Sequence, residues 1–185
     1  MFKKIKKLFS IKKRNYKAYD LPHETLYKKI LIKSYNDWFY KDLEVKNDIN
    51  GRFEIIVLHI FIIFYSLKEN SEVNKIFKQN FLETFIDELE STYRELGISD
   101  NTFGKKMKTA AKSLYGRLNI YNNTFKNNSK FEEALLRNIW PLDTELTNKV
   151  HKLSEYAYKK VDKYSNKSCL LYTSPSPRDD PLSRM

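Results

Sequence analysis

The most apolar stretch of the chain runs from Asn50 to Leu67, with the sequence NGRFEIIVLHIFIIFYSL. From Ile55 onward nearly every side chain is large and apolar, and only His59 and Ser66 interrupt the run. Such a segment is short for a bilayer span and typical of a buried helix. A helix that is apolar on all sides needs neighbours on all sides, so the pattern predicts the central helix of a bundle.

Amphipathic segments with helical periodicity flank this run and are the expected covering of the core. They begin at Pro22, whose helix buries Leu26, Tyr27, Ile30, Leu31 and Tyr35, and continue over 71–97, 100–121, 129–140 and about 144–164. Ser71 is an expected N-cap, and Gly97 an expected helix end. Asn128 or Ser129 is the expected cap of the fourth of these segments. The sequence therefore predicts an all-α, single-domain bundle of about six helices over residues 20–165.

The polar residues inside the central segment need partners. Arg52, His59 and Ser66 recur every seven residues and form one narrow polar line on the helix. The next helix carries a charged row at spacings of three and four: Glu83, Asp87, Glu90 and Arg94. This row is either a solvated face or part of a buried network with Arg52 and His59. The favoured interpretation of His59 is a hydrogen-bonded core residue.

Catalytic and metal-binding signatures are missing from the sequence. It contains no P-loop, no GxGxxG after a strand, no HExxH and no GxSxG motif. The single cysteine, Cys169, leaves no internal disulfide and no cysteine-based zinc site. We therefore expect a protein that is not an enzyme and holds no cofactor or metal.

The net charge of +11 predicts anionic partners, and much of it lies in residues 1–19. The basic residues there are Lys3, Lys4, Lys6, Lys7, Lys12, Lys13 and Arg14. Apolar residues at helical spacing give this segment the pattern of an interfacial amphipathic helix that contacts a membrane or ribosome. A solvated, disordered tail and an organelle targeting peptide are the alternatives. A second lysine face, with Lys105, Lys108 and Lys112, is either solvated or another such contact.

An aromatic cluster, Trp38, Phe39 and Tyr40, precedes the polar connection to the central segment. Clusters of this kind usually form the edge of a core. A ring that stays exposed becomes a candidate contact for a partner protein. Gly116, inside a helical stripe, is expected at a tight contact because glycine costs about 1 kcal/mol relative to alanine there.

Four linked motifs point to a family. GRFEIIVLH at 51–59, YRELGISD at 93–100, AAKSLYGRLNIY at 110–121 and ALLRNIW at 134–140 occur in an order and spacing that resembles the ubiquinol-cytochrome c chaperone domain. The resemblance covers about residues 24–163. Its motif residues in this chain are Gly51, Arg52, Phe53, His59, Arg94, Glu95, Gly97, Asp100, Tyr115, Gly116, Arg117, Arg137 and Asn138.

The resemblance implies a helical assembly factor for respiratory complex III with no catalytic residue. It implies newly made cytochrome b as client and association with the ribosome. The basic segment 1–19 adds an anionic membrane surface as an expected partner, and a second assembly-factor subunit is a further candidate. The expected location is the cytoplasmic face of a bacterial inner membrane, or alternatively the matrix side of the mitochondrial one. The main rival is a basic helical protein that binds RNA or the ribosome without a respiratory client, followed by a helical scaffold; no DNA partner is expected.

The last residues, 166–185, change composition abruptly to Ser, Thr and Pro. They resemble a translated adapter read-through at the broken end of an assembled sequence, and a genuine disordered tail is the alternative. On the read-through interpretation, Cys169 is not a native residue.

Overall fold

The computed structural model describes residues 22–67, 71–143, 145 and 147–165. The predicted basic segment 1–19 and the predicted tail 166–185 lie outside these residues, as does Cys169. The described chain consists of helices: α2 (Pro22–Ser34), a short π-helix η1 (Trp38–Asp42), α3 (Ile49–Ser66), α4 (Glu72–Glu95), α5 (Asp100–Thr124), α6 (Asn128–Ile139) and α7 (Asn148–Ser165). The all-α prediction is confirmed.

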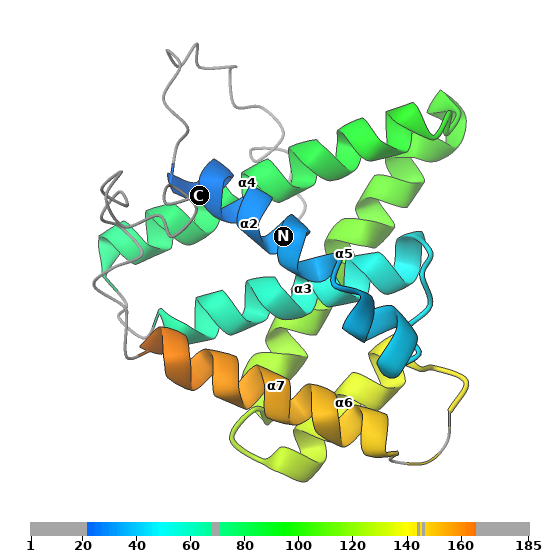
Figure 1. Cartoon of the computed structure of the whole chain (residues 1–185). Helices are drawn as coiled ribbons and strands as arrows, with labels where there is room; N and C mark the ends of the chain where they lie inside the picture. The colour runs from blue at the N-terminus through cyan, green and yellow to red at the C-terminus, as the bar shows by residue number, and fades with distance from the viewer. Residues whose placement is uncertain (1–21, 68–70, 144, 146, 166–185) are drawn as a thin grey trace, which may run out of the picture.

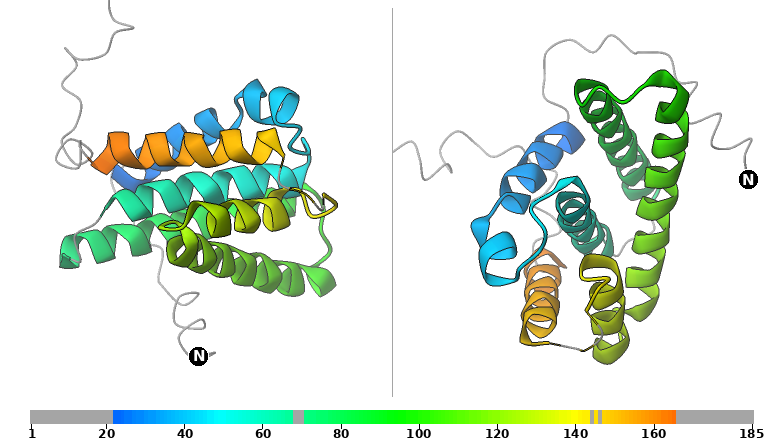
Figure 2. Two further views of the ribbon diagram at one scale, coloured as in Figure 1. Left: turned by 90° about the horizontal axis from the view of Figure 1, so that it is seen from below. Right: turned by 90° about the vertical axis from the view of Figure 1, so that its right-hand side faces the viewer.

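Helix α3 is the centre of the molecule, as its apolar sequence predicts. It packs against α2, α5, α6 and α7, while α4 lies on α2 and α5. Figure 2 shows α3 nearly end-on in its right-hand view, with the other helices arranged around it. Most of its residues are buried, because neighbours cover it on several sides. Figure 1 shows α4 and α5 extending together beyond the rest of the bundle.

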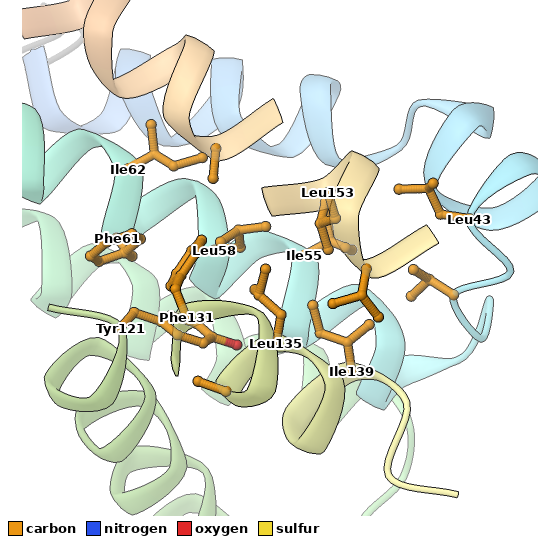
Figure 3. Close-up of a cluster of buried hydrophobic side chains, with 14 of the residues drawn as sticks. Leu43, Ile55, Leu58, Phe61, Ile62, Tyr121, Phe131, Leu135, Ile139 and Leu153 are labelled. Carbon is orange, nitrogen blue, oxygen red and sulfur yellow. The ribbon is translucent and has the colours of Figure 1, made fainter. Parts of the chain in front are cut away.

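The two sides of α3 belong to two apolar clusters. Ile55, Leu58, Phe61 and Ile62 face α5, α6 and α7, where they meet Tyr121, Phe131, Leu135 and Leu153. Figure 3 shows these side chains pointing toward one another from their different helices. On the other side, Val57, Ile60 and Ile63 pack with residues of α2 and α4, including Tyr27, Phe81 and Phe85. One helix therefore supplies both halves of the core.

Among the described residues, α3 has the length and apolar composition of a membrane-spanning helix. It is nevertheless 61% buried inside the bundle over that window. This burial matches the prediction of a core helix.

Local signals place the helix ends. Ser71 caps α4 through the backbone N–H of Asn74, at 3.2 Å, which confirms the predicted N-cap. Gly97 follows α4 with a positive φ of 68°, the left-handed conformation that favours glycine. The cap of α6 is Asn127, whose Oδ1 accepts the N–H of Lys130 at 3.1 Å. The expectation of Asn128 or Ser129 was wrong, because Asn127 is the residue with extended backbone.

The close backbone contact expected at Gly116 occurs at a different glycine, Gly51. A Cβ at Gly116 would meet no atom within 4 Å, so the predicted tight contact at Gly116 is wrong. The close approach occurs at Gly51, where a Cβ would lie 1.9 Å from the carbonyl oxygen of Lys46. The loop that enters α3 therefore folds directly over the first turn of that helix.

Candidate functional site

His59 lies at the centre of the bundle, where α2, α3 and α7 meet. Its side chain is buried, with Nδ1 2.8 Å from the carbonyl oxygen of Ile55 and Nε2 2.9 Å from the hydroxyl of Tyr156. The carbonyl can only accept, so Nδ1 is assigned as the donor and Nε2 as the acceptor from Tyr156. The hydroxyl of Ser34 is a further neighbour, 3.4 Å from Nδ1. These partners confirm His59 as a hydrogen-bonded core residue.

Burial lowers the pKa of His59 to about 4, and the backbone hydrogen bond at Ile55 opposes this only in part. The nearby ammonium groups of Lys33 and Lys160 lower the pKa further. The imidazole is therefore neutral near pH 7 and serves as a fixed link between α3 and α7.

An aromatic group surrounds this histidine. The ring of Phe39 lies 5.6 Å from His59 and 5.4 Å from Tyr156, in edge-to-face geometry. Trp38 packs on the same tyrosine at 5.5 Å. Edge-to-face contacts of this kind add to the apolar burial of the rings. They fix η1 against α3 and α7.

The structure corrects one of the three predicted client contacts. Phe39 is 1% exposed and belongs to the main apolar cluster, so its ring is not available to a partner in this fold. Trp38 and Tyr40 are only partly buried at the edge of that cluster. Tyr40 is anchored through its hydroxyl, which donates to the carbonyl oxygen of Ser34 at 2.6 Å. The aromatic cluster is thus an edge of the core with two rings that reach the surface.

A buried ion pair joins α3 to α5. Arg117 Nε donates to Glu54 Oε1 at 2.7 Å, and the guanidinium also lies 5.8 Å from the centre of the Phe53 ring. The carboxylate side chain is 7% exposed and the guanidinium side chain 23%. Burial raises the pKa of Glu54, while its hydrogen bond and charge contact with Arg117 lower it. Sequence reasoning did not pick out Glu54; the signal was an acid at the start of an apolar run.

Arg52 corrects the predicted buried network. It is exposed, donates to Asn47 Oδ1 at 2.9 Å and lies over the ring of Tyr35 at 5.4 Å. Tyr35 itself is 53% exposed, contrary to its expected place on the buried face of α2. Ser34 occupies the buried position beside it. Arg52 therefore contacts neither His59 nor the acidic row of α4.

The acidic row of α4 is a surface feature. Glu90 pairs with Arg94 at 3.0 Å on the same helix, and Glu83 accepts from Gln79 at 3.0 Å. The pKa of Asp87 is raised, first by partial burial and then by the neighbouring charges of Glu90 and Glu83. The network hypothesis is wrong, and the interpretation of a solvated face fits.

Residues 41–169 match the family described as ubiquinol-cytochrome C chaperone, which is well over half of the chain. The chain belongs to the ubiquinol-cytochrome c chaperone family. The crystal structure of the Cbp3 homolog from Brucella abortus aligns with a TM-score of 0.73 and 24% identity, covering 92% of this chain and 93% of that one. At this identity the likeness shows the shared fold. No curated protein matches the chain.

In this ubiquinol-cytochrome c chaperone, several motif residues hold helices together. Gly51 allows the loop to cross α3, and Arg117 neutralises Glu54. Asn138 donates to the hydroxyl of the fully buried Tyr121 at 3.3 Å, which joins α6 to α5. His59 joins α3 to α7. These contacts give a structural reason for their places in the motifs.

Other motif residues of the chaperone lie at its surface. Arg94 stacks over the ring of Phe103 at 4.6 Å, across the turn that joins α4 to α5. The remaining exposed motif residues are Glu95, Gly97, Asp100, Tyr115, Gly116 and Arg137. The lysines of the α5 face, Lys105, Lys108 and Lys112, are also exposed. The motif residues therefore do not converge on one catalytic centre, and the described residues contain no cluster of three or more metal-ligating side chains.

Proposed function

We propose that this protein is an assembly chaperone for ubiquinol-cytochrome c reductase, respiratory complex III, which holds newly made cytochrome b through contacts that involve no catalysis. The observation that carries the proposal is the family match over residues 41–169. The bundle supports it: the two titratable groups buried in α3, His59 and Glu54, are each engaged by partners within the fold. Fully engaged groups stabilise a scaffold and leave binding to its surface.

The candidate client surface lies where α2, η1 and the start of α3 meet. Tyr35 and Ile49 are large apolar residues that are 53% and 43% exposed there. Arg52 links them, because it lies over the Tyr35 ring and one helical turn after Ile49. Tyr40 lies close enough to Arg52 and Tyr35 for both to act electrostatically on it, and together these four residues form what we call the α2–α3 patch. The other half-buried edge ring, Trp38, packs on Tyr156 of α7 and is a separate candidate contact. Aromatic and arginine side chains of this kind dominate binding energy at protein interfaces.

Basic residues provide the proposed attachment to a membrane or ribosome. Lys105, Lys108 and Lys112 lie on one exposed face of α5, and the basic segment 1–19 adds a second cationic region in the sequence. Charges of this type hold a protein at an anionic surface reversibly and in a salt-dependent way. The proposed location is the cytoplasmic face of a bacterial inner membrane or the matrix side of the mitochondrial one, with a second assembly-factor subunit as a further partner.

Capture from the native organism separates this function from the rival RNA-binding role. The tagged full-length chain is purified with and without nuclease treatment, and cytochrome b and RNA are measured in the eluate. The proposal predicts that cytochrome b stays bound after nuclease. Loss of cytochrome b together with RNA would favour the RNA- or ribosome-binding alternative.

Two pairs of variants test the patch itself. Tyr35→Ser with Ile49→Ser should reduce captured cytochrome b severalfold, because both side chains are exposed and contribute mainly to the surface. The matched control is Val73→Ser with Leu142→Ser, at positions 67% and 83% exposed outside the patch. Equal capture by both double variants would place the client elsewhere.

A further inference from the structure

A cavity of about 90 Å³ lies between α2, α3 and α7. Its lining residues are Leu26, Lys29, Ile30, Lys33, His59, Ile63 and Tyr164. They come from three helices that are far apart in the sequence, and α2 and α7 both pack on α3, which forms the floor. A single water needs about 10 to 15 Å³ on this measure, so the cavity has room for a group much larger than one water.

The interior of the cavity is apolar. Leu26, Ile30 and Ile63 supply aliphatic walls, and the two nitrogens of His59 are already engaged by Ile55 and Tyr156. The floor therefore offers little hydrogen bonding to a polar guest. Cavities with apolar walls favour an aliphatic or aromatic group over water.

The mouth of the cavity is cationic. Lys29 and Lys33 are exposed and stand one helical turn apart on α2. The ammonium of Lys33 is held at the rim, because it donates to the hydroxyl of Tyr164 at 2.7 Å and lies 5.2 Å from the centre of that ring. From α7, Lys160 lies over Tyr156, and both Lys33 and Lys160 act electrostatically on His59.

No carboxylate of the described residues forms an ion pair with Lys29, Lys33 or Lys160. Lys29 and Lys33 thus place two positive charges at the entrance of an apolar hollow, and Lys160 adds a third near His59. This combination is complementary to a molecule with an anionic head and an apolar chain. The basic segment 1–19 is not a suitable occupant, because its positive charge would be repelled by the lysines at the mouth of the cavity.

We propose that this cavity binds an anionic phospholipid, with its phosphate at Lys29 and Lys33 and the end of an acyl chain between Leu26, Ile30 and Ile63. The site would turn the α2–α7 face toward the bilayer and select acidic headgroups. The site would add a specific lipid contact to the membrane attachment proposed above. It depends on the proposed function only in assuming that the protein meets a membrane. A free fatty acid has the same chemistry, so the two sources must be compared.

Calorimetric titration of the purified full-length protein with soluble short-chain lipids tests the site without any client. Dihexanoyl phosphatidylglycerol should bind, and dihexanoyl phosphatidylcholine, inorganic phosphate and hexanoate should bind at least about tenfold more weakly. Comparable binding of the zwitterionic lipid or of phosphate alone would overturn the site. Stronger binding of hexanoate would overturn the assignment to phospholipid.

Variants locate the binding. Lys29→Ala with Lys33→Ala should weaken phosphatidylglycerol binding at least about tenfold. Leu26→Trp should weaken it by filling a half-buried wall of the cavity. The control Lys126→Ala with Lys130→Ala removes the same charge at exposed positions beside the start of α6, which do not line the cavity, and should change binding little. Equal weakening by both lysine pairs would show a general charge effect and contradict the site.

The lipid-binding proposal and the chaperone proposal can be contradicted independently of each other. Cytochrome b capture by the Lys29→Ala, Lys33→Ala variant reports on the client function, while the titration reports on the lipid. Lipid binding that is absent in the wild type, with client capture intact, would overturn the cavity proposal and leave the chaperone function standing.

Discussion

At the scale of single residues, the two charged or titratable side chains buried in α3 differ in what their burial requires. His59 is neutral and needs only hydrogen bonds, which Ile55 and Tyr156 provide. Glu54 lies against Arg117, 63 residues away in the sequence, and its charge depends on that partner. Removing one partner of a buried pair leaves an uncompensated charge, which costs more than the pair contributes.

Replacing Arg117 with alanine should therefore destabilise the fold. We expect a loss of about 3 kcal/mol in the free energy of unfolding, measured by urea denaturation. The control Arg94→Ala removes an exposed ion pair with Glu90 and should cost below about 1 kcal/mol. If the double change Glu54→Leu, Arg117→Met fails to recover most of the loss, the cost came from packing and not from the unpaired carboxylate.

His59 predicts a pH dependence of stability. Its pKa falls from 6.5 in the unfolded chain to about 4 in the fold, so between these values the unfolded state binds the extra proton. Stability is fully present above pH 6.5 and decreases as the pH falls toward 4. The loss at about pH 5 should be on the order of 2 kcal/mol.

Denaturation of the wild type and of His59→Gln at neutral pH and at about pH 5 measures this contribution. The wild type should lose about 2 kcal/mol more than the variant between the two conditions. An equal loss in both proteins would mean that other groups carry the pH dependence.

The heptad spacing identified His59 and Ser66 as core residues but misplaced Arg52. Seven residues fall short of two full helical turns, so positions seven apart drift by about 20° per repeat. Arg52 also lies in the first turn of α3, where Asn47 and the ring of Tyr35 are within reach. The pairing of Glu54 with Arg117 depends on how α5 crosses α3, which no local pattern encodes.

At the scale of helices, the periodicity of apolar residues was sufficient to predict most of the helices. The central run and the amphipathic stripes predict α3, α4 and α5 closely, because apolar spacing and caps such as Ser71 are local properties. The π-helix η1 was not predicted. Its geometry is tied to tertiary contacts, including Trp140 Nε1, which donates to the carbonyl oxygen of Leu43 at 3.1 Å.

The two motif glycines should respond oppositely to alanine. Gly116→Ala adds a methyl group to an open helix surface and should stabilise the protein by about 0.5 to 1 kcal/mol. Gly51→Ala places Cβ against the Lys46 carbonyl and should destabilise it by more than about 1 kcal/mol. Thermal melting of both variants makes the comparison.

The opposite ordering of the two melting temperatures would contradict the packing of the loop over α3. A large loss for Gly116→Ala in client capture, with melting unchanged, would instead assign that position to the exposed binding surface of α5.

At the scale of the whole molecule, the sequence predicts an all-helical bundle around one apolar helix, and the structure confirms it. The family is likewise confirmed by the match over residues 41–169. The site was less predictable: the motif residues divide between buried contacts, such as Arg117, and exposed ones, such as Arg137. A sequence motif can contain residues that stabilise the fold and residues that bind a partner, and the burial of each residue in the structure is needed to distinguish them.

The proposed role of the bundle is that of a scaffold whose surface holds a client. Its interior polar groups stabilise the fold, the α2–α3 patch offers exposed apolar and aromatic area, and exposed lysines lie along one face of α5. This division explains why the described residues combine a well-packed core with large apolar side chains left at the surface.

Deletion of the gene tests the central claim most directly. Cytochrome b and assembled complex III are then quantified beside the other respiratory complexes, in the deletion strain and in a strain that regains the wild-type gene. We predict that cytochrome b and complex III are lost, that the other complexes accumulate normally, and that the wild-type gene restores both. Normal levels of complex III in the deletion strain would contradict the chaperone function.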